Sequence, residues 1–152
     1  MYYVEQNMWT ITNNLYNFRV LCLFMKENEE IIAIITKKED INKIVSKLKG
    51  YSFSNLKKKE HYYYSIYQKN TDEQKLADIF VEFERIDMIM ERKRKDGICN
   101  YDIFYKMDDG SYILYAVNFD TTPPTMINAY SVERNYEQFK KYIIKRYWQQ
   151  MI

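Results

Sequence analysis

Apolar residues form two short runs near the N-terminus, with a polar turn between them. Phe18–Met25 is apolar apart from one arginine, residues 27–30 are polar, and Ile31–Ile35 is apolar and mostly β-branched. Continuous apolar runs of this length, bounded by a turn, are typical of strands that are largely covered. The two runs therefore predict a β-hairpin.

The next segment has the periodicity of a helix. Thr36 and Glu39 form a capping-box pattern at its start, and Gly50 lies where a left-handed C-terminal cap is expected. This spacing predicts a helix that buries one face. Its apolar residues recur at i, i+3, i+4 and i+7, and they are Ile41, Ile44, Val45 and Leu48.

The middle of the chain predicts one strand and one long helix. His61–Tyr67 is aromatic and rich in strand-forming residues. A second capping pattern, Thr71 with Gln74, then introduces an apolar stripe that continues to about Lys95. A helix over Asp72–Lys95 would contain about 24 residues and span roughly 36 Å. Gly97 would end it.

The C-terminal part predicts a three-stranded meander and a last helix. Tyr101–Met107 and Ser111–Phe119 flank Asp109-Gly110, a pair favoured in type I′ hairpin turns, where both central residues need positive φ. Thr125–Val132 supplies the third strand. The apolar spacing of Arg134–Met151 predicts the helix.

This order of elements predicts an α+β fold. Strands joined by tight turns favour a mostly antiparallel sheet, here of about five to six strands. Three helices, one of them long, are expected to pack on one face of the sheet as a two-layer sandwich. Because no low-complexity linker interrupts the chain, we expect residues 1–152 to form a single domain.

The composition argues against several kinds of chemistry. The chain has 16 tyrosines but only three glycines, two cysteines and one histidine. No glycine has a second glycine nearby, so a P-loop and a dinucleotide fingerprint are excluded. Cys22, His61 and Cys99 lack the paired spacing of a zinc site, and a Cys–His nucleophile would need folding to bring distant residues together. We predict neither a cofactor nor a metal.

Other features of the composition indicate a cytoplasmic protein. No apolar run reaches the roughly 18 residues of a membrane helix, and the N-terminus does not have the pattern of a signal peptide. The two cysteines lie in apolar strand-like contexts, as expected of free thiols in a reducing compartment. The excess of lysine over arginine, with abundant isoleucine and asparagine, follows AT-rich codons and indicates a bacterial or viral genome.

Aromatic and basic residues make protein binding the favoured function. On a strand, Tyr62, Tyr63 and Tyr64 cannot all point inward, because successive side chains face opposite ways. Exposed tyrosines are typical of interfaces, and nearby lysines would steer an approaching partner. We expect a non-catalytic binding protein, such as a small inhibitor or immunity-type protein of phage or mobile-element origin that blocks a larger protein. The predicted partner-binding residues are Lys57, Lys58, Lys59, Tyr62, Tyr63, Tyr64 and Tyr67.

An alternative function is binding of RNA or single-stranded DNA. Cations beside exposed rings suit this role, because cations follow the phosphates and rings stack on bases. The same charges are also typical of a solvated surface and of cations that complement a helix C-terminus. The candidate residues are Arg92, Lys93, Arg94, Lys95, Lys141, Lys145, Tyr147 and Trp148.

A third function is a metal-dependent nuclease. Glu91-Arg92-Lys93 matches the Glu-x-Lys fragment of restriction-like nucleases, and Asp102 offers a second acid. Those nucleases place the fragment on a strand, whereas the pattern here assigns it to the end of a helix.

Overall fold

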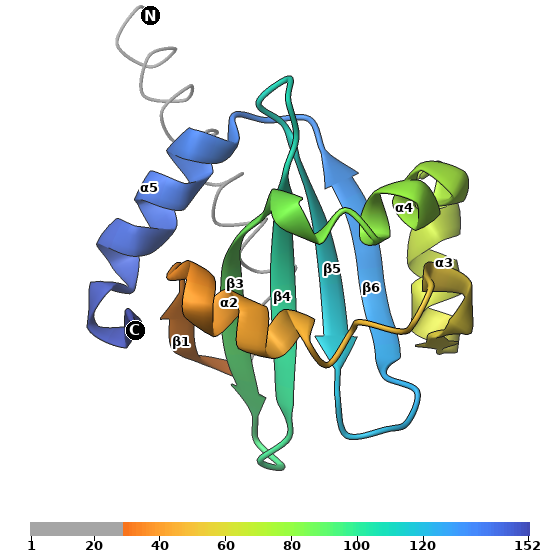
Figure 1. Ribbon diagram of the computed structural model, residues 1–152, viewed down its shortest axis with the longest axis horizontal. Helices are drawn as coiled ribbons and strands as arrows, with labels where there is room; N and C mark the ends of the chain where they lie inside the picture. The colour runs from red at the N-terminus through yellow and green to blue at the C-terminus, as the bar shows by residue number, and fades with distance from the viewer. Residues whose placement is uncertain (1–28) are drawn as a thin grey trace, which may run out of the picture.

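A six-stranded β-sheet organises residues 29–152, which are the part of the chain that the computed structural model describes (Figure 1). The strand order is β1-β3-β4-β5-β6-β2. Neighbouring strands are antiparallel except for β2, which pairs in parallel with β6, so the sheet is mixed. The strands are β1 (Glu29–Ile35), β2 (Lys57–Lys58), β3 (Ile86–Arg94), β4 (Cys99–Lys106), β5 (Tyr112–Asn118) and β6 (Thr125–Val132).

Four α-helices accompany the sheet within these residues, one more than predicted, and none of them is long. In Figure 1, α2 and α4 lie in front of the strands, α3 lies beside β6, and α5 lies at the other side of the molecule. The helices are α2 (Lys38–Val45), α3 (Glu60–Gln68), α4 (Glu73–Phe80) and α5 (Tyr136–Arg146). The 3-10 turns are η1 (Phe53–Asn55), η2 (Phe83–Arg85) and η3 (Trp148–Gln150).

Both faces of the sheet carry an apolar core. On β4 and β5, Ile103 and Tyr115 pack into one core with α2, α3 and α4, whereas their neighbours Phe104 and Leu114 pack into a second core with α5. Successive side chains of a strand point to opposite faces, so the two cores lie on opposite sides of the sheet. The expectation of a two-layer sandwich with every helix on one face was therefore wrong for α5. The run Tyr112–Val117, buried along its whole length, is typical of a strand covered on both faces.

The α+β class and most of the short elements are confirmed. Ile31–Ile35 lies in β1, and Thr125–Val132 is β6 with the predicted bounds. The hairpin between β4 and β5 is also confirmed, but its turn is not type I′. Gly110 has a positive φ of 85°, whereas Asp109 does not, and the Asp109 carboxylate instead accepts a hydrogen bond from the Ser111 amide at 2.9 Å. The predicted strand Phe18–Met25 lies outside the described residues.

The long helix over Asp72–Lys95 was wrong. The chain leaves α4 after Phe80, passes through η2, and continues as strand β3. The spacing of the apolar residues among residues 86–90 would fit one face of a helix. In the structure, however, Ile89 pairs with Ile35 of β1 and with Ile103 of β4. Pairing on both sides inserts this segment into the sheet, and tertiary contacts of this kind override local pattern.

The predicted strand His61–Tyr67 was also wrong, because these residues form most of α3. The two capping predictions were close but displaced by one residue. The N-cap residues are Lys37 and Asp72, and the Asp72 side chain accepts a hydrogen bond from the Lys75 amide at 3.2 Å. Gly50 has a φ of 97° after the last turn that follows α2, as expected for a left-handed residue.

Candidate functional site

The α3 helix is fixed to the sheet by its inward face. Ser65 is buried, and its hydroxyl donates to the Asn128 side-chain oxygen of β6 at 2.8 Å. Glu60 lies in the first turn, where a negative charge complements the helix dipole. Asn70 follows the helix with a φ of 46°, a left-handed conformation that ends helices. The helix is therefore held at both ends and along one side.

Three tyrosines cover the outward face of α3. Tyr63, Tyr64 and Tyr67 are 55%, 61% and 83% exposed. Tyr67 follows Tyr64 by three residues and Tyr63 by four, a spacing that makes Tyr67 a neighbour of both on the helix surface. We call these three residues the tyrosine face. Its three residues belong to the partner-binding set predicted from the sequence.

Tyr62 belongs to the core and not to this surface. Its side chain is fully buried, its ring lies 6.1 Å from that of Phe53, and its hydroxyl donates to Glu73 Oε1 at 3.0 Å. Burial, together with the hydrogen bond to Glu73, holds the pKa of Tyr62 well above its ordinary value. Its predicted role as an exposed anchor is therefore incompatible with its position.

The three consecutive lysines before α3 also separate into two kinds. Lys57 and Lys59 are exposed. The Lys58 ammonium turns inward, donates to the Phe53 carbonyl oxygen at 2.5 Å, and lies 4.6 Å from the centre of the Phe53 ring. Burial lowers the pKa of Lys58, although Glu73 opposes this effect. Lys58 therefore stabilises the η1 segment, and Lys57 and Lys59 are the exposed cations of this run.

The second basic run lies at the end of β3 and in the turn that follows. Lys93 and Lys95 are exposed, and Arg94 forms an ion pair with Asp96 at 3.0 Å. Arg92 is buried and forms ion pairs with Asp102 and Glu29. Its position among acids makes Arg92 part of a buried polar network, unlike the exposed cations predicted from the sequence.

The Arg92–Asp102 ion pair has two close contacts, one of which is a hydrogen bond. Arg92 Nε lies 2.6 Å from Asp102 Oδ2, and Nη2 donates to Oδ1 at 2.8 Å. Burial raises the pKa of the Asp102 carboxyl, and the adjacent guanidinium opposes this effect. The network connects β3 to β4 on the face that also carries α5.

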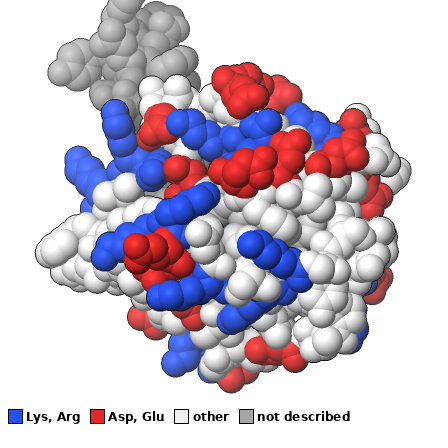
Figure 2. Space-filling view, viewed as in Figure 1, with Lys and Arg blue, Asp and Glu red and all other residues white. Residues whose placement is uncertain are grey.

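The remaining residues that were predicted to bind nucleic acid lie on α5 and at η3. Lys141 and Lys145 are exposed on α5, Tyr147 is half-buried, and Trp148 is 66% exposed on η3. This group is separate from α3 in the fold (Figure 1). On the face that carries α2 and α4, basic and acidic side chains lie next to one another and do not form a field of one sign (Figure 2).

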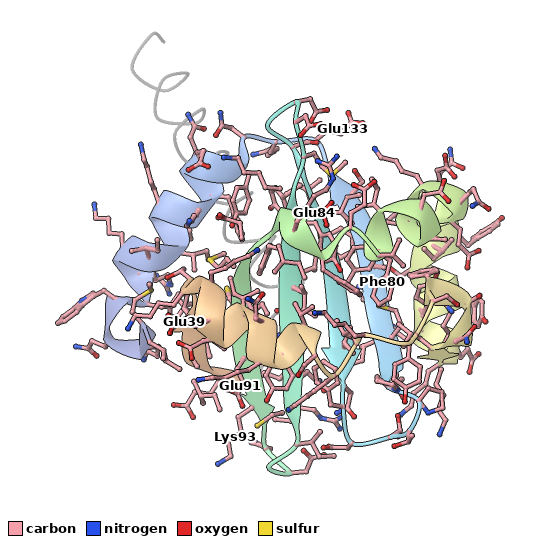
Figure 3. All side chains as sticks on the ribbon, in the orientation of Figure 1. Glu39, Phe80, Glu84, Glu91, Lys93 and Glu133 are labelled. Atoms are coloured by element: carbon pink, nitrogen blue, oxygen red, sulfur yellow. The ribbon has the colours of Figure 1, made fainter. Side chains whose placement is uncertain are left out.

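The acids of the nuclease hypothesis point to different sides of the sheet. Glu91 now lies on a strand, as the nuclease fragment requires, and it accepts a hydrogen bond from the Tyr101 hydroxyl at 3.1 Å. Figure 3 shows Glu91 and Lys93 together toward the end of β3. Asp102 is buried on the opposite face with Arg92. Among residues 29–152, no three histidine, cysteine or acidic side chains form a group suited to hold a metal ion.

A cavity of about 420 Å³ lies beside the buried ion pair. Lys59 and His61 at the start of α3 line it, together with Arg92 and Arg94 of β3. Two basic runs that are far apart in the sequence therefore meet here. The sequence gives no local signal for this cavity, because its walls come from several separate segments.

Comparisons with protein-family models, with curated proteins and with solved structures found no match. In the described part of the chain, no helix has the length and apolar character needed to cross a membrane.

Proposed function

We propose that this protein is a non-catalytic binding protein that contacts a larger protein through the tyrosine face of α3. The observation that supports this function is the exposure of three neighbouring rings on one short helix. Aromatic residues are enriched at protein interfaces, and contiguous exposed aromatic surface marks interaction sites. In this proposal the protein is a small cytoplasmic inhibitor or immunity-type protein of phage or mobile-element origin.

The local structure favours binding by a preorganised surface. The Ser65–Asn128 and Tyr62–Glu73 hydrogen bonds fix the helix, and the Tyr63 ring packs edge-on against Tyr62 with ring centres 5.1 Å apart. Rings that are already held in place lose little entropy when a partner binds. The exposed Lys57 and Lys59 favour a partner with acidic residues around an apolar centre.

Site-specific photocrosslinking tests this proposal. A benzophenone amino acid in place of Tyr64 or Tyr67 should capture a protein from the cells in which the chain is made. The same amino acid in place of Val81, which is 52% exposed at the end of α4, is the control. The captured protein is then purified. Tyr64→Ala and Tyr67→Ala should each weaken its binding by about tenfold or more.

Two results would contradict the proposal. One is capture of the same proteins from position 81 as from positions 64 and 67. The other is binding by both alanine variants that stays within about twofold of the unmodified chain.

Binding of RNA or single-stranded DNA is the second candidate function. The meeting of Lys59 with Arg92 and Arg94 at one cavity favours it. If it is correct, the affinity for a single-stranded oligonucleotide should fall steeply as the salt concentration rises, because bound cations on the strand are released. A flat salt response, or no binding at low salt, would eliminate this candidate.

A further inference from the structure

The cavity lies across the face of the sheet that also carries α5. Its floor includes residues of β3, β4, β5 and β6, and the start of α3 forms one end. From β3 to β6 there are three strand spacings, which amount to about 14 Å. A cavity of about 420 Å³ falls in the range of small-molecule sites in proteins.

Three asparagines lie in this floor, and the side-chain oxygen of each accepts a hydrogen bond, whereas, in the part of the chain that the structure describes, only Asn118 also donates through its Nδ2. Asn100 Oδ1 accepts from Asn118 Nδ2 at 3.0 Å, and Asn118 Oδ1 accepts from the Asp120 amide at 2.8 Å. Asn128 Oδ1 accepts from the Ser65 hydroxyl at 2.8 Å. The carboxylates of Asp102 and Glu29 are occupied by Arg92.

The groups that remain in the cavity are mainly donors. Asn100 is 4% exposed, and within residues 29–152 neither its Nδ2 group nor that of Asn128 has a hydrogen-bond partner. In the same part of the chain, Lys59 and His61 make no ion pair or side-chain hydrogen bond. Each asparagine amide carries two N–H donors, and lysine carries three. A ligand that satisfies this set must be rich in acceptors, and the lysine favours a negative charge.

The apolar part of the lining indicates that the ligand is larger than an inorganic anion. Ile98, Leu114 and Ile127 line the cavity between the polar groups. Two acidic side chains also line it: Glu29, which forms an ion pair with Arg92, and Asp120, whose exposed carboxylate lies 3.4 Å from Asn118 Nδ2. We propose that the cavity binds a small organic phosphate, with the phosphate on Lys59 and His61 at one end, and with acceptor groups of the organic part on the asparagine amides and its apolar part against the apolar wall.

Titration of the full-length protein tests the proposal with three probes: inorganic phosphate, adenosine monophosphate, and a five-nucleotide single strand without a terminal phosphate. The side-chain amide NMR signals of Asn100 and Asn128 report binding, and Asn100→Asp and Asn128→Asp assign them. Adenosine monophosphate should shift both signals at concentrations up to about 10 mM, and inorganic phosphate should bind more weakly.

A matched pair of variants separates the cavity from general surface charge. Lys59 lines the cavity, whereas Lys57, two residues earlier, does not. Lys59→Ala should weaken binding about tenfold, the effect of losing one charge-assisted hydrogen bond, and Lys57→Ala should have little effect. Both lysines are exposed. Thermal melts should therefore show two equally stable variants.

Each outcome of the titration has a meaning. Tighter binding of the five-nucleotide strand than of adenosine monophosphate, with the same dependence on Lys59, supports the site and identifies a phosphodiester as its ligand. Inorganic phosphate that binds as tightly as the nucleotide overturns the proposal of an organic ligand. No shift of either asparagine signal, or equal effects of the two lysine variants, overturns the site. None of these results depends on whether the tyrosine face binds a protein.

Discussion

Tyr62 and Tyr63 are consecutive, and their rings meet edge-to-face with centres 5.1 Å apart, yet one side chain is fully buried and the other is 55% exposed. On a helix, adjacent residues point in directions about 100° apart, so one ring can reach the core while the next lies on the surface. The contact connects the tyrosine face directly to the core. A change in the buried ring should therefore alter the position of the exposed one.

The first prediction contrasts these positions. Tyr62→Ala should destabilise the fold by about 3 kcal/mol, because it leaves a cavity and removes the partner of Glu73. Tyr67→Ala should change the free energy of unfolding by less than about 0.5 kcal/mol, because Tyr67 is 83% exposed. Urea denaturation of the two variants measures both values. Equal destabilisation would show that Tyr67 contributes to the core and would weaken the proposed interface.

The second prediction concerns the Arg92–Asp102 pair. Asp102→Ala should destabilise the fold by about 3–5 kcal/mol, because it removes a carboxylate that pairs with the buried Arg92 charge. The triple variant Glu29→Gln, Arg92→Met and Asp102→Leu should be more stable than the single variant, because it leaves none of these three charges buried without a partner. Denaturant titrations of the two variants compare their free energies of unfolding. A triple variant less stable than Asp102→Ala would contradict the argument that an unpaired buried charge is the main cost of Asp102→Ala.

Arg94→Ala serves as the control for that experiment. Arg94 lies two residues further along β3, and its ion pair with Asp96 is about half exposed on both sides. Exposed ion pairs contribute little, so the change in unfolding free energy should stay below about 1 kcal/mol.

The third prediction is a pH dependence that arises from Asp87. This carboxylate connects β3 to α5, accepting hydrogen bonds from Lys140 Nζ and the Tyr136 hydroxyl, both at 2.8 Å. Burial opposes ionisation, but the two donors and the Lys140 charge hold the pKa of Asp87 below its ordinary value. A lowered carboxyl pKa stabilises the fold above the unfolded pKa near about 4, and this contribution disappears as the pH falls through the folded pKa.

Asp87→Asn should therefore lose about 1 kcal/mol of stability at neutral pH, a value reduced by the partial exposure of the pair. The difference from the unmodified chain should shrink as the pH falls below about 4. Thermal melts from neutral to acidic pH measure it, and Lys140→Met should show a similar trend. A stability difference that stays constant from neutral to acidic pH would contradict the assignment of this pH dependence to Asp87.

The fourth prediction concerns Lys69, the residue after α3. Its ammonium lies 3.4 Å from the centre of the Tyr130 ring, and burial lowers the pKa of Lys69 to about 8. In the unfolded chain a lysine titrates near about 10.4, so folding increases the uncharged, nucleophilic fraction at mildly alkaline pH. Trace acetylation at a series of pH values, read by mass spectrometry, should place half-maximal reactivity of Lys69 near pH 8. The prediction would be contradicted if the acetylation of Lys69 depended on pH in the same way in folded and in urea-unfolded protein.

The elements that could be predicted from the sequence are those with local signals. The α2 helix has a four-residue apolar stripe followed by a glycine, and the meander has the turn at Gly110 between strands of clear pattern. By contrast, β3 follows α4 after η2, a single 3-10 turn. The spacing of its apolar residues is consistent with either a helix or a strand. Only pairing with β1 and β4 decides between them. The face on which α5 packs is likewise set by contacts that a linear pattern does not contain.

In the candidate sites, too, features with a local signal could be predicted from the sequence, whereas features set by tertiary contacts could not. The argument that three consecutive tyrosines cannot all be buried predicted that either Tyr63 or the pair Tyr62 and Tyr64 faces outward, and the structure exposes Tyr63 and Tyr64. A strand, however, would have separated these two rings onto opposite faces, whereas α3 places both outward and Tyr62 inward. The cavity could not have been predicted, because it brings Lys59 and His61 next to residues of β3 through the order of the strands.

The shortness of β2 has a consequence for aggregation. This edge strand has two residues, both lysines, and one of them is exposed. A long, flat sheet edge presents a row of unpaired N–H and C=O groups to which another chain can add a strand, whereas a short edge carrying positive charge offers almost none. Beside it, β6 is shielded by this strand and by α3. On this side, therefore, the sheet offers little backbone with which a strand of another molecule could pair.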